Sequence, residues 1–421
     1  MNAVSPRPSP LALVLSSLLV VLCSLALSAD PPASPGLPDK VDPEKEAERL
    51  AKLLKEFPEA DLDKDGKLTR EEALRYREQA LGHAAPDPDE VRGATPWFFS
   101  VDPGWSKDRF PDHALCYKTP EEIKKLFPDV VSFEKPTDGA LRVLGTGHSF
   151  MQPGYRTLPH ICKGAGFNQP LHTHIGGGIQ GSTRYLWELE NGIFERDKNP
   201  YPKLLASISN GEWDAMMWGP YFNDKPEYYT CWMDYCLKFN PHMKFYLSDA
   251  WPSIMLLGIL PTSEKELTTD LFKKLGTITR SQMANLVKQL QKDYPDKAFI
   301  LPTTDALILA VERFHQGKLP GVEGINKSVG DKERSLWSDP IGHLGPGIDR
   351  LPGYVFYSTL YGRSAELIDG KIPFKETAYP CDELDMAFRR IAWEAVVNSP
   401  LSGFTDKDGD GIGEATGAVG K

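Results

Sequence analysis

The sequence predicts an α/β fold, arranged as a three-layer α/β/α sandwich around a five-stranded parallel sheet. Five short apolar runs lie between residues 141 and 301, and segments with helical character lie between them. Parallel strands need long crossover connections, and helices in those connections cover both faces of the sheet. The chain has 421 residues, of which 41% are hydrophobic and 25% charged, so it is long enough for one large domain with small appendages.

Each expected strand is a run of four to six residues, followed later in the chain by a longer helical stretch. The strands are Leu141–Leu144, Gln169–His174, Trp213–Trp218, Lys244–Ser248 and Ala298–Leu301. The helices are Tyr155–Ala165, Thr183–Phe194, Pro226–Phe239, Glu264–Tyr294, Thr304–Gln316, Gly353–Tyr361 and Asp385–Val397. Between Ser281 and Leu290, apolar residues recur at intervals of three and four, which is typical of an amphipathic helix.

The first 29 residues are typical of a targeting segment. An apolar run extends from Leu11 to Leu27, Arg7 is the only charged residue before it, and Leu27-Ser28-Ala29 offers a cleavage site. We predict a cleaved signal peptide, with an uncleaved membrane anchor as the alternative. The mature protein is then exported, to the periplasm or the extracellular space. Loss of Arg7 changes its net charge from −10 to −11, which argues against nucleic acid or an anionic membrane as a partner.

The rest of the chain divides by composition into four segments. Residues 30–83 contain a flexible lead and a calcium-binding unit, and residues 84–138 are rich in Pro, Asp and Lys, as expected of a linker that packs on the main domain. Residues 139–402 hold the strand–helix alternation. Residues 403–421 form an acidic tail with a partial calcium loop.

An acidic loop from position 61 to position 72 fits the EF-hand template. Oxygen ligands are expected at loop positions 1, 3, 5, 7, 9 and 12, with glycine at position 6 for the turn. Gly66 holds position 6, and the ligands are Asp61, Asp63, Asp65, the backbone carbonyl of Lys67, Thr69 and Glu72. Residues 44–57 and 70–81 are the expected flanking helices. We predict a structural Ca²⁺ site.

A second acidic run begins in the same way with Asp406, Asp408 and Asp410. Gly413 and Gly417 occupy positions 8 and 12, so the apolar anchor and the bidentate carboxylate of the template are missing. Two interpretations remain open, a calcium loop that pairs with the first and a solvated tail.

Ser149 is the candidate nucleophile. The run from Leu141 ends in Gly145-Thr146-Gly147-His148-Ser149, and a new segment opens with Pro153. Such a pattern predicts a buried strand and a tight turn that lifts a hydroxyl to the carboxyl edge of the sheet, where ligands bind in α/β folds. The alternative is a turn serine that only caps the following helix.

A serine hydrolase also needs a base, an acid that orients it, and donors for the oxyanion. Asp339 and His343 lie together on one loop rich in glycine and proline, just before a helix. Glycines from 176 to 181 follow the second strand and enter a helix, where backbone N–H groups point outward. Asn223 follows the third strand and has a side-chain amide that can donate.

The order Ser, Gly, Asn, then Asp and His on one late loop resembles the SGNH/GDSL hydrolase superfamily, over about residues 141–397. Gly147-His148-Ser149-Phe150 is similar to the first motif block, Gly181 to Glu188 to the second, and Asp339 to His343 to the fifth. The resemblance implies that Ser149 attacks, that His343 is the general base and that Asp339 orients it. It also implies an oxyanion site made by the N–H groups of Ser149 and Gly181 and the side chain of Asn223.

The chain departs from the family pattern at three places. The acid usually lies three residues before the histidine, but Pro340 holds that position here and Asp339 is one residue early. The family's asparagine usually lies two residues after a glycine, whereas Asn223 lies four after Gly219. Gly178 competes with Gly181 as the second-block glycine.

Two further groups of residues have alternative interpretations. His172 and His174 are two apart on a strand and share a face, so they are either metal or substrate ligands or a partly exposed pair at the strand end. Trp187, Trp218, Trp232, Trp251 and Trp337 lie near expected strand ends, where exposed rings would stack on sugars and buried ones would belong to the core.

The leading hypothesis is an exported serine esterase that removes acyl groups, acetyl in particular, from a small-molecule or polysaccharide ester. The sugar preference rests on export, tryptophan content and the family resemblance. The alternatives are a non-catalytic, calcium-stabilised glycan-binding protein on the same fold and a metal-dependent hydrolase that uses His172 and His174.

Overall fold

The protein is represented by a computed structural model, which describes residues 58–69, 72, 130–175, 203–220, 224, 226–375 and 379–416, with isolated positions at 47, 50, 51, 54, 55 and 125. The chain forms two compact units, Met1–Glu90 with Thr95–Ser100, and Val91–Ala94 with Val101–Lys421. The expected signal peptide, the helix at 183–194, Gly178, Gly181, Trp187 and Asn223 lie outside the described residues. Among the described helices, none combines the length and hydrophobicity needed to cross a membrane.

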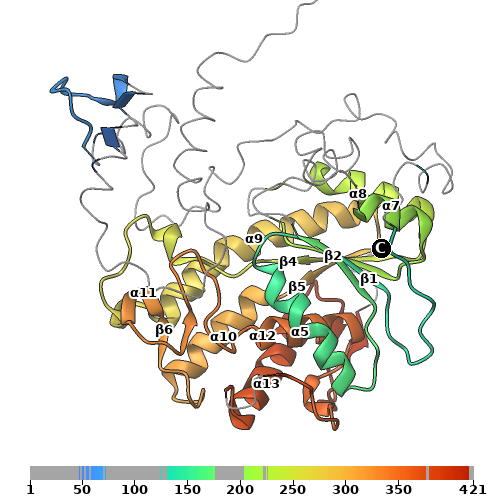
Figure 1. Ribbon diagram of the computed structural model, residues 1–421. Coiled ribbons are helices and arrows are strands. Elements are labelled where there is room, and N and C mark those ends of the chain that lie inside the picture. The colour runs from blue at the N-terminus through green and yellow to red at the C-terminus, as the bar shows by residue number, and fades with distance from the viewer. Residues whose placement is uncertain are drawn as a thin grey trace, which may run out of the picture. The chain divides into compact units, whose positions relative to one another are not determined.

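The larger unit is built on a five-stranded sheet in the order β2-β1-β3-β4-β5 (Figure 1). All of its strand pairs are parallel. The strands are β1 (Val143–Gly147), β2 (Leu171–Ile175), β3 (Ala215–Trp218), β4 (Lys244–Ser248) and β5 (Ala298–Leu301). The predicted α/β class and the five-stranded parallel sheet are therefore confirmed.

Alternate residues along each strand enter two different cores, as the period of a pleated strand requires. Val143 and Met217 belong to the core on one face, whereas Leu144 and Met216 belong to the core on the other. Apolar residues on both faces explain why the strands appear in the sequence as continuous apolar runs.

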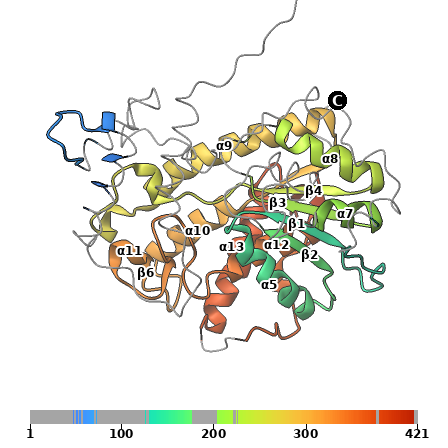
Figure 2. The same ribbon diagram turned by 45° about the horizontal axis from the view of Figure 1, so that its top comes forward.

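The first core lies under helices α5 (Met151–Gly164), α10 (Thr303–His315), α12 (Arg350–Tyr361) and α13 (Asp382–Asn398). Figure 2 shows α5, α12 and α13 together on one side of the sheet. The second core lies under α7 (Lys203–Asn210), α8 (Glu227–Phe239) and the C-terminal half of α9 (Thr269–Asp293). The helices thus form two layers with the sheet between them.

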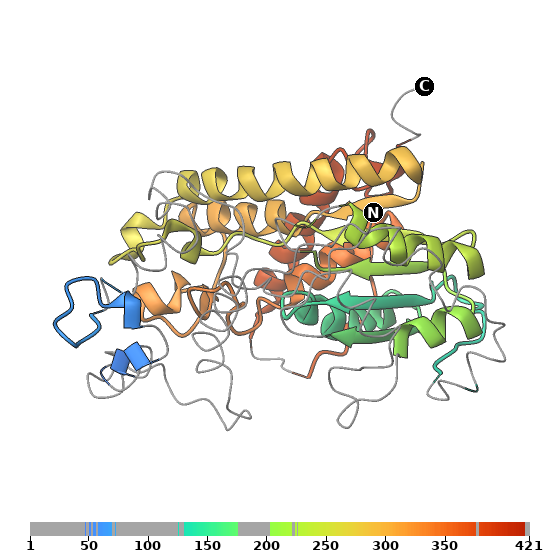
Figure 3. The ribbon, with the colours of Figure 1, turned by 90° about the horizontal axis from the view of Figure 1, so that it is seen from above.

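Helix α9 contributes to both cores. It has 25 residues, begins at the N-cap Thr268, whose side chain accepts from Leu271 N, and runs beside α10 (Figure 3). Phe272 and Leu275 near its start belong to the first core, and Met283 and Leu290 further along belong to the second. The predicted span Glu264–Tyr294 is therefore almost right, but the 3₁₀ turn η6 (Glu264–Glu266) is separate from the α-helix.

Several short helices and strands lie in the connections between these main elements and after α12 and α13. They are η5 (Ile254–Leu257) after β4, β6 (Gly324–Asn326), α11 (Lys327–Gly330) and β7 (Ser335–Trp337) after α10, η7 (Ala365–Leu367), and the hairpin of β8 (Phe404–Thr405) and β9 (Glu414–Ala415). Strands β6 and β7 pair in parallel and lead directly into the loop that carries Asp339 and His343. In the smaller unit, the structure describes the 3₁₀ turn η1 (Pro58–Ala60), the loop that follows it, and isolated helical positions at 47, 50, 51, 54, 55 and 72. Most of the expected flanking helices, residues 44–57 and 70–81, lie outside the described residues.

Candidate active site

The turn between β1 and α5 presents Ser149 at the carboxyl edge of the sheet. Gly147 ends β1 with φ +128°, and a Cβ at this position would lie 2.7 Å from the backbone nitrogen of Gly219. His148 O accepts from Met151 N at 3.0 Å and Ser149 O accepts from Gln152 N at 3.1 Å, so the turn closes directly into α5. Ser149 is exposed.

Tyr155 of α5 fixes this turn against β3. Its hydroxyl lies 2.9 Å from both the Thr146 and the Met217 carbonyl oxygens, at the ends of the neighbouring strands β1 and β3. The ring occupies the space beside Gly145, where a Cβ would come within 2.5 Å of it. The glycine at 145 therefore serves the packing of α5 on the sheet.

Asp339 and His343 face each other across a closed turn. Ser338 N donates to His343 O at 2.7 Å and closes the turn. Asp339 Oδ1 accepts from Gly342 N at 2.9 Å and from His343 N at 3.0 Å, and Asp339 Oδ2 lies 2.5 Å from His343 Nδ1. The carboxylate is thus held by two backbone donors while its second oxygen bonds the imidazole.

A sharp backbone turn lets an acid four residues before the histidine reach the imidazole. Gly342 has φ +115°, a conformation that residues with a side chain rarely adopt. The Pro340 carbonyl accepts from Ser253 Oγ at 2.5 Å and from Met255 N at 3.3 Å. The spacing that departs from the family pattern therefore still places the carboxylate on Nδ1.

The nucleophile candidate and the base candidate meet at this edge. Ser149 Oγ lies 3.1 Å from His343 Nε2, although the two residues are 194 positions apart in the chain. With Nδ1 donating to the carboxylate, Nε2 of the neutral ring is the acceptor that faces the hydroxyl. The three side chains form a continuous Ser–His–Asp series.

The electrostatics of the pair suit a general base. Burial alone would raise the pKa of Asp339, but the hydrogen bond and charge of His343 and the two backbone donors hold that pKa below its ordinary value. The hydrogen bond to Asp339 raises the pKa of His343 against the opposing effect of burial. The ion pair formed after proton transfer is thereby stabilised.

His148, the residue before Ser149, is a buried neighbour of the site that the sequence did not single out. Its ring is buried beneath the nucleophile turn, Nδ1 accepts from Phe150 N at 3.3 Å, and Nε2 lies 3.4 Å from the Pro220 carbonyl oxygen. Burial lowers its pKa to about 4, so the ring is neutral near pH 7. Only its position beside Ser149 marks it in the sequence.

Aromatic rings pack against His343 and against the residue that follows Ser149. Phe150 stacks on Trp251 with ring centroids 4.8 Å apart and meets His343 edge-on at 5.7 Å. Of the five tryptophans considered as sugar-stacking surfaces, four are described, and all four are buried in the core: Trp218, Trp232, Trp251 and Trp337. These rings offer no exposed stacking surface.

The oxyanion donors Gly181 and Asn223, with the alternative Gly178, lie outside the described residues. Their assignment remains a prediction. His172 and His174 are half-buried on the edge strand β2, opposite Leu144 and Thr146. Within the described part of the chain, neither belongs to a cluster of three groups able to hold a metal.

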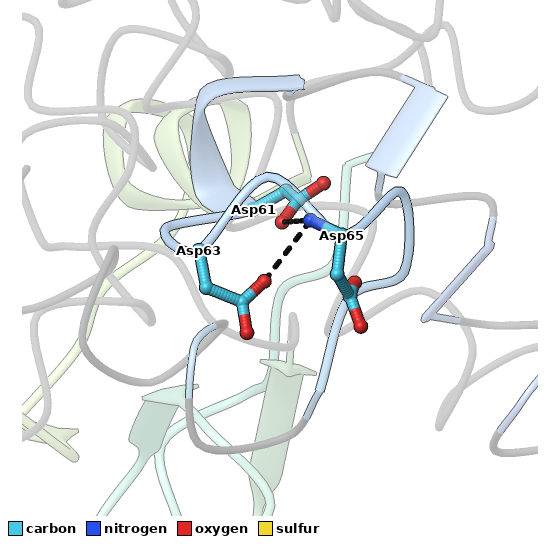
Figure 4. Close-up of side chains that lie close together, drawn as sticks. All are labelled: Asp61, Asp63 and Asp65. Carbon is cyan, nitrogen blue, oxygen red and sulfur yellow. Dashed lines mark hydrogen bonds between the residues drawn. The ribbon is translucent and has the colours of Figure 1, made fainter.

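The described part of the first acidic loop, residues 61–69 and 72, is compact. Ligand oxygens of Asp61, Asp63 and Asp65 lie within 4.8 Å of one another, and Figure 4 shows the backbone nitrogen of Asp65 between the first two carboxylates. Gly66 has φ +81°, and its N–H donates to Asp61 Oδ2 at 2.9 Å. Glu72 folds back over the loop and accepts from Leu62 N and Asp63 N at 3.2 and 3.3 Å. Carboxylate oxygens are ligands that Ca²⁺ prefers, and the expected calcium site at this loop remains a prediction.

The second acidic run lies in the hairpin of β8 and β9, where Asp408 and Asp410 are exposed. Asp406, Asp408 and Asp410 again bring carboxylate oxygens within 4.8 Å. Asp406 Oδ2 accepts from Trp393 Nε1 of α13 at 2.8 Å. Two backbone hydrogen bonds, Ser364 N to Gly411 O and Gly413 N to Gly362 O, both at 2.8 Å, fasten the loop to the end of α12.

Comparison with known proteins gives little support beyond this geometry. No family model matches the chain, and no curated protein matches it in sequence. A DUF4886 family protein from Bacteroides uniformis is similar in structure at a TM-score of 0.41 and 13% identity, over 62% of this chain and 95% of that one. A protein from Streptococcus pneumoniae, provisionally described as a platelet activating factor, has a TM-score of 0.29 and 12% identity, over 57% and 91%. With scores this low, neither likeness bears on function.

Proposed function

We propose that this protein is a serine hydrolase that cleaves acyl esters. The observation that carries the proposal is a series of two hydrogen bonds. Ser149 Oγ lies 3.1 Å from His343 Nε2, and His343 Nδ1 lies 2.5 Å from Asp339 Oδ2. A serine hydroxyl is a weak nucleophile unless a base takes its proton, and this arrangement supplies the base and its orienting acid.

The chemistry follows from these positions. Ser149 Oγ attacks the ester carbonyl carbon while His343 Nε2 takes its proton, and Asp339 stabilises the imidazolium through Nδ1. Nε2 then gives the proton to the leaving alcohol, and an acyl-serine remains. Water attacks the acyl carbon by the same route and releases the acid. We expect the N–H groups of Ser149 and Gly181 and the amide of Asn223 to hold the oxyanion.

The substrate is proposed to be an acetylated carbohydrate, met outside the cytoplasm by an exported protein. Support comes from the leader-like first 29 residues and from the family resemblance. The described tryptophans are buried, so stacking of a sugar on their rings gives no support to this choice of substrate.

A fluorophosphonate probe tests the reaction class directly. We expect the folded wild-type protein to be labelled, and Ser149→Ala and His343→Ala to lose the label. Labelled wild type would justify a screen of acylated glycans and simple esters. Absence of labelling on folded wild type would contradict the proposal and favour a binding protein on the same fold. Chelator-sensitive hydrolysis by unlabelled protein would favour a metal enzyme.

We also propose a structural Ca²⁺ in the loop formed by Asp61, Asp63, Asp65, Lys67, Thr69 and Glu72. The clustered carboxylates and the position of Glu72 support it. Ca²⁺ takes no part in the proposed ester cleavage, because the reacting groups are supplied by Ser149, His343 and Asp339.

A further inference from the structure

The base candidate is fixed through the backbone as well as through its ring. The peptide unit between Gly342 and His343 has two polar ends. Its N–H donates to Asp339 Oδ1 at 3.0 Å, and its carbonyl, that of Gly342, accepts from Trp251 Nε1 at 2.7 Å. One buried tryptophan and the triad acid therefore clamp the same peptide plane from opposite sides.

We infer that Trp251 is a positioning residue, which acts through the Gly342–His343 peptide to align Asp339 with His343; this inference rests on the proposed hydrolase function. A donor on the carbonyl side of a peptide polarises its N–H, so the bond to Asp339 Oδ1 becomes stronger. Without the Trp251 donor, the turn is held on one side only.

Trp251 is itself anchored well enough to serve this purpose. It follows β4 by three residues, and the hydroxyl of Thr304 lies 2.7 Å from the Ala250 carbonyl oxygen. The backbone nitrogen of Thr304 donates to Asp249 Oδ1 at 2.7 Å. The segment before Trp251 is thus attached to the first turn of α10, which belongs to the same core as Trp251.

The same tryptophan also reaches the nucleophile side. Phe150, the residue after Ser149, stacks on Trp251 with only 11° between the ring planes. A Cβ on Gly342 would lie 3.1 Å from Phe150 Cζ and 3.4 Å from Trp251 Nε1, so the glycine lets both rings approach the turn. Trp251 therefore links the nucleophile turn to the turn that carries the base.

Trp251→Phe isolates the donor, because it keeps an aromatic ring and removes Nε1. A matched control is Trp213→Phe. Trp213 is also buried, and its Nε1 donates to the Ser207 carbonyl at 2.8 Å, but it belongs to the core on the other face. Both variants lose one tryptophan hydrogen bond to a carbonyl, so we expect similar losses of stability, and only one bond touches the site.

The first readout is the rate of fluorophosphonate labelling between pH 5 and 9. Among the described residues, the titratable groups facing His343 are Asp339 on its own loop and the buried His148 beside Ser149, and His148 stays neutral through this range. For Trp251→Phe we expect the labelling rate on the high-pH plateau to be about tenfold lower. We also expect the fall of the rate on the acid side to lie about half a pH unit lower than in wild type. Trp213→Phe should keep the wild-type profile.

The second readout is the His343 pKa, followed by NMR on ¹⁵N-histidine protein and assigned with His343→Ala. It needs no activity. A lower His343 pKa in Trp251→Phe but not in Trp213→Phe supports the inference, even if no serine is labelled. Absence of labelling would contradict only the hydrolase proposal. Equal behaviour of the two variants in both readouts overturns it. If Trp251→Phe does not fold, Trp251→Met, which also lacks Nε1, must lower the His343 pKa, or the inference fails.

Discussion

At the scale of single residues, the site depends on two histidines with opposite environments. His343 is partly exposed and paired with a carboxylate, which raises its pKa, whereas His148 is buried, which lowers its pKa to about 4. The first is suited to exchange a proton with Ser149. The second is suited to hold backbone groups in place, because its ring stays uncharged at neutral pH.

His148 should make the protein sensitive to acid. Its folded pKa of about 4 lies below the ordinary 6.5, so the unfolded chain binds the proton more readily between these values. Stability is therefore full above about pH 6.5 and is lost as pH falls toward 4, by up to about 3 kcal/mol. Urea unfolding at pH 7 and pH 4.5 measures this loss, which should shrink in His148→Leu. The same replacement at His160, half-buried on α5, is the control; an equal change there would contradict the assignment.

Residue-scale contacts were also the hardest to predict. The nucleophile turn was visible because glycines and a serine follow an apolar run. The fit of Asp339 to His343 was not, since it depends on the positive φ of Gly342 and on Ser253 holding the Pro340 carbonyl. Trp251 appears in the sequence as one tryptophan among several, and only the fold brings its Nε1 to the Gly342 carbonyl.

At the scale of elements, the strand-to-helix turn is the most constrained part of the fold. Gly147 combines a positive φ with a neighbouring backbone too close for any Cβ, and Gly219 on that neighbour has Met151 equally close. Three segments, β1, α5 and the end of β3, therefore meet with no room for side chains.

Gly147→Ala should destabilise the protein by about 2–4 kcal/mol, because it adds a backbone clash to the strain of a positive φ. Gly166→Ala is the matched control. Gly166 has φ +87° but nothing within 4 Å of an added Cβ, so it carries the conformational strain alone, about 1 kcal/mol. Denaturant unfolding of both variants separates the two effects. Equal losses would show that the close approach of Gly219 is relieved at no cost.

The expected elements were largely recovered because burial on both faces of a parallel sheet leaves a simple pattern. Four of the five expected strands overlap the observed ones with shifts of two residues or fewer at either end, and β1 extends three residues further, through Gly145-Thr146-Gly147. Glycine and threonine carry no apolar signal, so the sequence pattern ended at Leu144. The true end of this strand is set by pairing with β2.

At the scale of the whole molecule, the acidic loop at 61–72 and the Ser–His–Asp series belong to different compact units. We therefore expect calcium to affect stability and chemistry separately. Ca²⁺ should raise the melting temperature of wild type by mass action, and Asp65→Ala should remove most of that shift. The fluorophosphonate labelling rate at 25 °C should be unchanged in this variant.

Calorimetric titration of Ca²⁺ into chelator-treated protein checks the site itself. Asp408→Ala, in the hairpin fastened to α12 and α13, is the companion variant, since it removes the equivalent carboxylate from the second acidic run. If Asp65→Ala binds Ca²⁺ as wild type does, the first loop is not the site. If it loses labelling at 25 °C, the two units are not independent.

The reach of α9 has a consequence for how the larger unit opens. Its first turns pack with α10 in one core, and its last turns enter the other core, to which α8 also contributes. Amide protons along one continuous helix can exchange with solvent only when the local structure opens, and neither end of α9 can open without exposing apolar side chains. One helix of 25 residues thus takes part in the cores on both sides of the sheet. The slowest exchanging amides of the two cores should therefore exchange through the same opening event.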